Sequence, residues 1–141
     1  MEQLPDFLQR HWLLTLALFG IIGLMAAGEV SRKLRRYTEI SPAEAARLIG
    51  KDDTLLLDVR EPDEFRQGHI RNATHVPLGK LAARVAEFEA YKDKPVVIYC
   101  RSGNRSGVAC AQLAKQGFTI VHNLAGGILA WQHDNLPVKK K

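Results

Sequence analysis

One cysteine of the chain stands where a residue could act as a nucleophile. Cys100 ends the run Pro95 to Tyr99 (PVVIY), whose β-branched and aromatic residues predict a buried strand. A polar loop and a predicted helix over residues 104–116 follow this strand. In open α/β sheets ligands bind beyond the carboxyl ends of the strands, so Cys100 is expected at a ligand-binding position.

The loop after Cys100 has the composition of an anion-binding cradle. Its residues are Arg101, Ser102, Gly103, Asn104, Arg105 and Ser106. Gly103 permits unusual backbone angles, and the loop leads into a helix N-terminus, so successive N–H groups can point toward one centre. Helix N-termini and adjacent cations favour a thiolate over a thiol and lower the pKa of a cysteine. We therefore interpret Cys100 as the nucleophile and the six loop residues as substrate-binding.

The second cysteine, Cys110, differs in its expected surroundings. It lies well inside the predicted helix 104–116, roughly 9 Å along the helix axis, so we expect a core residue that is badly placed to pair with Cys100. Two cysteines are too few for a disulfide framework. The five histidines are scattered and no pair has metal-ligand spacing, so neither a metal site nor a cofactor is expected.

Strand and helix patterns alternate through the rest of the chain and must position this loop. The expected helices are 42–49, after the capping box that Ser41 opens, then 61–65, 78–89, 104–116 and one near 130–131; the expected strands are 54–59, 74–76, 95–99 and 118–122. This alternation predicts an α/β domain with a parallel sheet that helices cover on both faces.

Two charged residues follow the strand predicted at 54–59. We expect Asp58 to be a buried carboxylate that accepts hydrogen bonds from loop N–H groups, and Arg60 to pair with Glu61 or Glu64. Both are interpreted as supporting residues for the site rather than catalytic ones. His69 is placed in the same group.

The N-terminal part of the chain has the pattern of a membrane anchor. Residues 12–28 carry no charge and would rise roughly 25 Å as a helix, just short of a ~30 Å hydrocarbon core. A cleaved signal peptide is the alternative. Only Arg10 closely precedes this stretch, whereas four basic residues lie between positions 32 and 36 after it. This asymmetry favours an uncleaved helix with the body on the cytoplasmic side of an inner or plasma membrane. We expect a short segment (1–11), a transmembrane helix (12–28), a basic linker (29–37), one domain (38–138) and a basic tail (139–141).

The charge distribution argues against nucleic acid as a partner. The chain of 141 residues has a net charge of +5, but residues 37–138 hold 12 basic and 12 acidic residues. Binding to a phosphate backbone needs a clustered positive surface on the domain itself. The excess charge lies in the linker and the tail, where it suits membrane lipid.

Several motifs in order resemble the rhodanese-homology family. They are Leu57-Asp58-Val59-Arg60-Glu61, Glu64-Phe65, Gly68-His69-Ile70, the Cys100 to Ser106 loop, and Gly126-Gly127-Ile128 with Trp131. The resemblance covers about residues 38–137. It implies a rhodanese-like fold and a sulfurtransferase whose cysteine carries sulfur as a persulfide, with thiosulfate or a persulfide as donor. The implied acceptors are cyanide, a small thiol or a protein thiol.

Two other functions are compatible with parts of the pattern. A cysteine phosphatase also uses a strand, a thiolate loop and a helix, but its loop has five residues between cysteine and arginine, whereas here Ser106 occupies that sixth position and Arg105 comes one residue early. The other alternative is a membrane-tethered module of the same fold that only binds a partner. The loop spacing argues against the phosphatase, and the retained cysteine and cationic loop favour catalysis over the partner-binding module.

Overall fold

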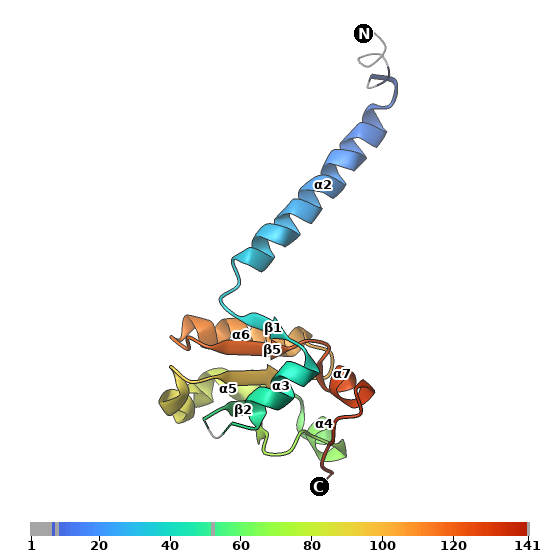
Figure 1. The fold of residues 1–141 in the computed structure, drawn as a ribbon. Helices are drawn as coiled ribbons and strands as arrows, with labels where there is room; N and C mark the ends of the chain where they lie inside the picture. Colours follow the sequence, from blue (N-terminus) through green and yellow to red (C-terminus); the bar gives the residue numbers. More distant parts are fainter. Residues whose placement is uncertain (1–6, 8, 52, 141) are drawn as a thin grey trace. The chain divides into compact units, whose positions relative to one another are not determined.

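The computed structural model describes residues 7, 9–51 and 53–140, which belong to two compact units. The first unit, residues 1–35, contains helix α2 (Trp12–Lys33). The second unit, residues 36–141, is the body with the sheet and the remaining helices (Figure 1).

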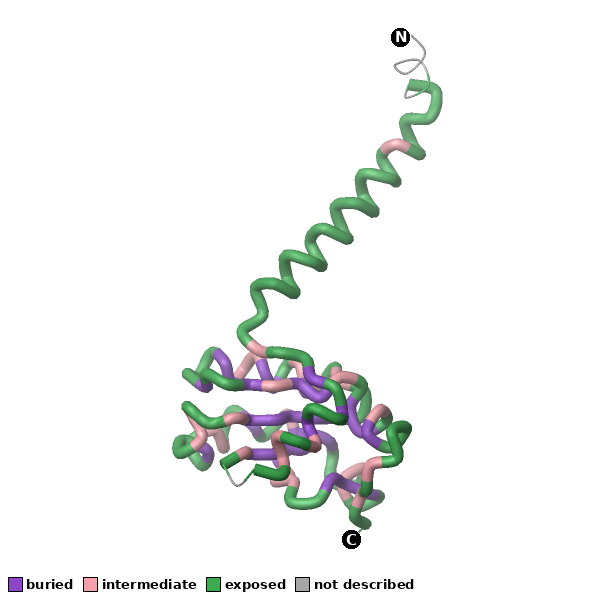
Figure 2. The backbone as a smooth tube through the Cα atoms, in the orientation of Figure 1, coloured by how far each residue is buried: buried purple, intermediate pink, exposed green. Residues whose placement is uncertain are grey.

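Helix α2 has apolar side chains on all sides and buries none of its residues (Figure 2). Its 22 residues rise about 33 Å, enough for a hydrocarbon core of about 30 Å. The helix continues beyond the uncharged stretch to Lys33, into the region expected to be a linker. By length and composition α2 is therefore a possible membrane anchor.

The body is built on a parallel sheet, as expected, and this sheet has five strands. Its strands are β1 (Thr38–Ile40), β2 (Leu55–Asp58), β3 (Thr74–His75), β4 (Val96–Tyr99) and β5 (Val121–Leu124), in the spatial order β1-β5-β4-β2-β3. Every neighbouring pair is parallel. All residues of β2 and β4 are buried, which explains why these strands read as continuous apolar runs.

Helices cover both faces of this sheet, so the alternating residues of a strand enter two different cores. Val96 and Ile98 of β4 pack with Leu113, whereas Val97 and Tyr99 pack with Trp131. The helices are α3 (Pro42–Ile49), α4 (Pro62–Gln67), α5 (Leu78–Arg84), the 3₁₀ helix η1 (Val85–Tyr91), α6 (Asn104–Lys115) and α7 (Gly127–His133). Residues of α5, η1 and α6 lie in the first core, and residues of α3 and α7 lie in the second.

Three elements differ from the sequence-based prediction. The last strand begins three residues later than expected, because Phe118 enters the core from the turn before β5. The helix expected over 78–89 is divided into α5 and η1. Strand β1 was not predicted, since it has three residues of which only Ile40 is buried.

Candidate active site

Cys100 directly follows the central strand β4, between the carboxyl end of the sheet and the start of α6. Strands β2 and β5 flank β4 on either side. The cysteine is 1% exposed, so its sulfur lies at the bottom of the loop. A reagent must therefore present a slender group to reach the sulfur atom.

Two polar groups lie within hydrogen-bond distance of this sulfur. The backbone N–H of Gly103 donates to Cys100 Sγ over 3.1 Å, and Ser106 Oγ lies 3.3 Å from the same atom. Gly103 has a φ of 103°, in the left-handed region that favours glycine, and this turn directs its N–H inward. The sulfur is thus held by polar groups even though the residue is buried.

These contacts determine the ionisation of the thiol. Burial raises the pKa of Cys100, but hydrogen bonds from the Ser106 hydroxyl and from the N–H groups of Ser106, Gly103 and Ser102 outweigh it, so the pKa is lowered. A lowered pKa gives a larger thiolate fraction at neutral pH. The sequence argument relied on the helix terminus and two arginines, whereas the leading favourable contributions are these hydrogen bonds.

The first turn of α7 holds the backbone at the start of the loop. The N–H of Ile128 donates to the carbonyl of Cys100 over 2.9 Å, and the N–H of Leu129 donates to that of Arg101 over 3.2 Å. Gly127 makes this approach possible, because a Cβ there would lie 2.4 Å from the carbonyl oxygen of Arg101. The glycine pair noted in the sequence is therefore part of the loop's support. Trp131 is buried in the core, as expected.

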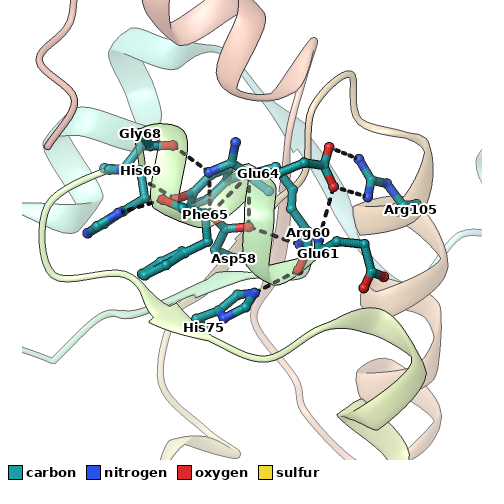
Figure 3. Close-up of polar contacts among 11 residues, drawn as sticks. Asp58, Arg60, Glu61, Glu64, Phe65, Gly68, His69, His75 and Arg105 are labelled. Carbon is teal, nitrogen blue, oxygen red and sulfur yellow. Dashed lines mark hydrogen bonds and ion pairs between the residues drawn. The ribbon is translucent and has the colours of Figure 1, made fainter. Parts of the chain in front are cut away.

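The two loop arginines have different surroundings. Arg105 donates to both carboxylate oxygens of Glu64, over 2.7 and 2.8 Å (Figure 3). The hydrogen bond from Arg105 lowers the pKa of Glu64 to about 2. Arg101 is exposed, and its side chain forms no hydrogen bond or ion pair with any residue that the structure describes. Arg101 is thus the arginine that remains available to an anion.

A cleft of about 270 Å³ lies beside the loop, and Arg101 lines it. Its lining is mostly polar and includes Arg60, Glu64, Gln67, Leu129 and Gln132.

The remaining predicted binding residues of the loop after Cys100 fall into two groups by burial. Ser102 and Asn104 are exposed on the loop, whereas Ser106 is fully buried against the sulfur.

Asp58 and Arg60 support the site through contacts that differ from those expected. Asp58 is fully buried and pairs with Arg60, whose Nη2 lies 2.7 Å from Asp58 Oδ2 and whose N–H donates to Oδ1 over 2.9 Å. The same Nη2 donates to the carbonyl of Gly68 over 2.7 Å (Figure 3). The partner of Arg60 is therefore Asp58, two residues away in the chain, and not Glu61 or Glu64.

His69 belongs to a stack of rings beside this ion pair. The Phe65 ring lies against His69 and His75, with centroids 3.8 and 4.5 Å apart (Figure 3). His75 Nε2 also lies 2.7 Å from the carbonyl oxygen of Arg60. The stack packs α4, which carries Glu64, against the strand at the sheet edge.

One residue of the site was missed by the sequence argument. Asn123 of β5 is 2% exposed and its Oδ1 lies 2.6 Å from Ser106 Oγ. Its Nδ2 donates to the carbonyl of Gly103 over 3.1 Å and to the carboxylate of Glu39. The predicted strand ended at residue 122, so an amide facing the loop was not anticipated. The sequence feature that could have indicated this residue is an asparagine next to the apolar residues of a strand.

Comparisons with known proteins agree with this geometry. The rhodanese-like domain family matches residues 41–134. A sulfurtransferase from Allochromatium vinosum is 46% identical over 98 residues, covering 70% of this chain and 90% of that protein. Thiosulfate sulfurtransferase GlpE from Coxiella burnetii is 38% identical over 96 residues, covering 68% and 88%.

A solved structure extends the similarity to the backbone. The polysulfide-sulfur transferase homodimer from Wolinella succinogenes is 29% identical, with a TM-score of 0.68, and the match covers 84% of this chain and 90% of that one. Sheet order, loop and sequence motifs thus lead to the same assignment. The chain belongs to the rhodanese-like family of sulfurtransferase-related proteins.

Proposed function

We propose that this protein is a sulfurtransferase that carries sulfane sulfur as a persulfide on Cys100. The donor is thiosulfate or a persulfide, and the acceptor is cyanide, a small thiol or a protein thiol. The observation that carries the proposal is the polar cradle around a buried sulfur, with Gly103 N–H at 3.1 Å and Ser106 Oγ at 3.3 Å. The sulfurtransferase names of two relatives support the reaction class.

The first step is a displacement at sulfur. The Cys100 thiolate attacks the outer sulfur of thiosulfate, a bond forms between Sγ and that sulfur, and the bond to the sulfite group breaks with its electron pair. Sulfite leaves as a dianion and Cys100 becomes a persulfide anion. No proton is transferred, so no general acid is needed beside the thiol. Donors in the loop stabilise the developing charge, as an oxyanion hole does in acyl transfer.

The second step returns the cysteine to its starting state. A nucleophilic acceptor attacks the outer sulfur of the persulfide, a bond forms between the acceptor and that sulfur, and the Cys100 thiolate leaves. With cyanide the product is thiocyanate. The hydrogen bonds that lower the pKa of Cys100 also make its thiolate a better leaving group.

Arg101 is the residue we assign to the anionic donor, because it lines the cleft and its side chain has no partner among the described residues. Arg105 is assigned to the support of α4 through Glu64. Arg101→Ala is expected to raise the KM for thiosulfate about tenfold, the effect of losing one charged hydrogen bond. An Arg105→Ala variant that raised KM more than Arg101→Ala would reverse the assignment.

The reaction can be tested with the full-length protein in detergent. Thiosulfate and cyanide are supplied, and sulfite and thiocyanate are measured for the wild type, Cys100→Ser and the matched control Cys110→Ala. We expect both products from the wild type and Cys110→Ala only. A phosphate ester is tested as a second substrate. Hydrolysis of this ester without release of sulfite from thiosulfate would identify the protein as a phosphatase instead. A partner-binding module would give neither product.

We further propose that α2 anchors the body to a membrane, with the body on the cytoplasmic side. The support is an apolar helix of 22 residues with Arg32 and Lys33 at its end. The full chain should stay with membranes after a high-salt wash, and a variant without residues 1–35 should not. If high salt released the full chain, the protein would be attached to the membrane surface rather than anchored by a spanning helix. If protease added outside the cell digested the body, the body would lie on the outer side of the membrane.

A further inference from the structure

The Ser106 hydroxyl has one proton and two neighbours that can accept it. Asn123 Oδ1 lies 2.6 Å from Ser106 Oγ, and Cys100 Sγ lies 3.3 Å from the same oxygen. A serine hydroxyl donates one hydrogen bond at a time. Ser106 is fully buried, so bulk water does not reach its hydroxyl. The amide oxygen and the sulfur therefore compete for one proton.

The orientation of the Asn123 amide is fixed by groups that only accept hydrogen bonds. Its Nδ2 lies 3.1 Å from each carboxylate oxygen of Glu39 and 3.1 Å from the carbonyl oxygen of Gly103. If the amide were turned over, its oxygen would face three other acceptors and its NH₂ group would face Ser106. Asn123 must therefore present its oxygen to the hydroxyl.

We propose that Asn123, held in this orientation by Glu39, is a positioning residue that competes with the Cys100 sulfur for the proton of the Ser106 hydroxyl. The inference rests on the proposed role of Cys100 as the reacting thiol. It adds a residue of β5 and a residue of β1 to the control of that thiol, although neither touches the sulfur or the substrate.

The competition gives the hydroxyl two arrangements. When Cys100 is a thiol, Ser106 donates to Asn123 Oδ1 and its oxygen accepts from the thiol S–H. When the sulfur is an anion, as thiolate or persulfide, the hydroxyl rotates to donate to the sulfur, and the buried Oδ1 loses its donor. An unpaired buried acceptor is unfavourable. Asn123 therefore opposes the anion through Ser106 while its NH₂ group holds the carbonyl of Gly103.

Two ionisable groups of α6 also interact with the sulfur. Arg105 interacts with Cys100 through its positive charge, and Cys110 lies in the same core as Cys100. Burial raises the pKa of Cys110 far above its ordinary value, so ultraviolet absorbance of thiolate reports Cys100 alone at moderate pH. The experiment leaves both groups unchanged.

A double-mutant cycle on the full-length protein in detergent tests the proposal. The thiolate absorbance is followed against pH for the wild type, Asn123→Leu, Ser106→Ala and the double variant. Asn123→Leu should increase the ratio of thiolate to thiol at a fixed pH about threefold, and Ser106→Ala should decrease it by a similar factor. In the Ser106→Ala background the Asn123→Leu substitution should have little effect on this ratio, because the proposed competition needs the hydroxyl.

A shift from Asn123→Leu that keeps its full size without the Ser106 hydroxyl would overturn the proposal, since a general loosening of the loop acts in both backgrounds. Glu39→Gln provides a second variant if Asn123→Leu does not fold. In about 1 M salt, which screens the charge of the exposed Glu39 carboxylate, Glu39→Gln should raise the ratio of thiolate to thiol by less than Asn123→Leu does. This increase should also vanish in the Ser106→Ala background. An unchanged thiolate pKa for Glu39→Gln would overturn the part of the proposal that assigns the orientation of Asn123 to Glu39, and would leave the Gly103 carbonyl as the group that orients the amide.

The titration is independent of sulfur transfer. If the cycle shows the expected coupling but thiosulfate yields no sulfite, the proposed function fails and the positioning role stands. If sulfur is transferred and the coupling is absent, the positioning role fails and the proposed function stands.

Discussion

The two cysteines of the body are both buried, yet they have opposite ionisation behaviour. Cys100 is 1% exposed and Cys110 is 0% exposed, but the pKa of Cys100 is lowered and that of Cys110 is raised. Both lie in the same core. The difference is that a backbone N–H and a hydroxyl group lie within hydrogen-bond distance of the sulfur of Cys100. Burial alone disfavours a thiolate, and the shape of the loop reverses the result.

The largest expected effect separates the two thiols by function. Cys100→Ser should reduce sulfur transfer by about a thousandfold or more, because the attacking sulfur is removed. Cys110→Ala should keep most of the activity and lose some thermal stability, because it only leaves a small cavity in the core. Sulfite release measures the activity of both variants, and thermal unfolding measures their stability. Loss of activity in Cys110→Ala, with folding intact, would contradict the comparison.

Alkylation against pH is the next test of the comparison. Cys100 reacts through its thiolate, whose pKa is lowered, so its reaction with iodoacetamide should persist below the ordinary pKa of a thiol and decline only as the pH falls through the lowered value. Cys110 should stay unmodified until the protein unfolds. Peptide mass spectrometry of the full-length protein gives both rates. Equal labelling of the two residues in the folded protein would show that the loop does not activate Cys100.

The support of the loop by α7 can be broken with a single methyl group. In Gly127→Ala the new Cβ would lie 2.4 Å from the carbonyl oxygen of Arg101, so the loop must shift. We expect about a hundredfold loss of sulfur transfer from misplacement of the cradle. Gly79→Ala in α5 is the matched control, since nothing lies within 4 Å of its Cβ. Near wild-type activity in Gly127→Ala would show that the loop is held by other contacts.

The smallest effect concerns the ion pair between Glu64 and Arg105. The pKa of Glu64 is lowered from 4.5 to about 2, so the pair adds stability above pH 4.5 and loses it as the pH falls toward 2. Both side chains are about one-third exposed, which limits the contribution to about 1 kcal/mol. Denaturant unfolding of residues 36–141 should show Glu64→Gln less stable than the wild type at pH 6. A difference that stayed constant down to pH 2 would exclude the ionised pair as its cause.

Much of the fold was predictable because the central strands are strongly patterned. The apolar run before Cys100 and the start of α6 at Asn104 were both predicted and confirmed. Strand β1 was not predicted, since its pairing depends on β5, about eighty residues away in the chain. The predicted start of the last strand was wrong, because an apolar residue such as Phe118 can be buried either from a strand or from a turn.

The site was predictable where residues are neighbours in the chain, and less so where they are not. Cys100 and the loop up to Ser106 form one segment, so their meeting follows from sequence. The contacts of Arg105 with Glu64 and of Ser106 with Asn123 join different elements, and only the packed structure shows them. The sequence alone therefore shows neither the Glu64 partner of Arg105 nor the amide beside Ser106.

The most direct test of the central claim is the mass of the Cys100 peptide after the full-length protein has reacted with thiosulfate. The account predicts a gain of one sulfur atom on Cys100, removed again by cyanide, and no gain on Cys110. A protein that releases sulfite without this adduct, or that carries the sulfur on Cys110, would contradict it.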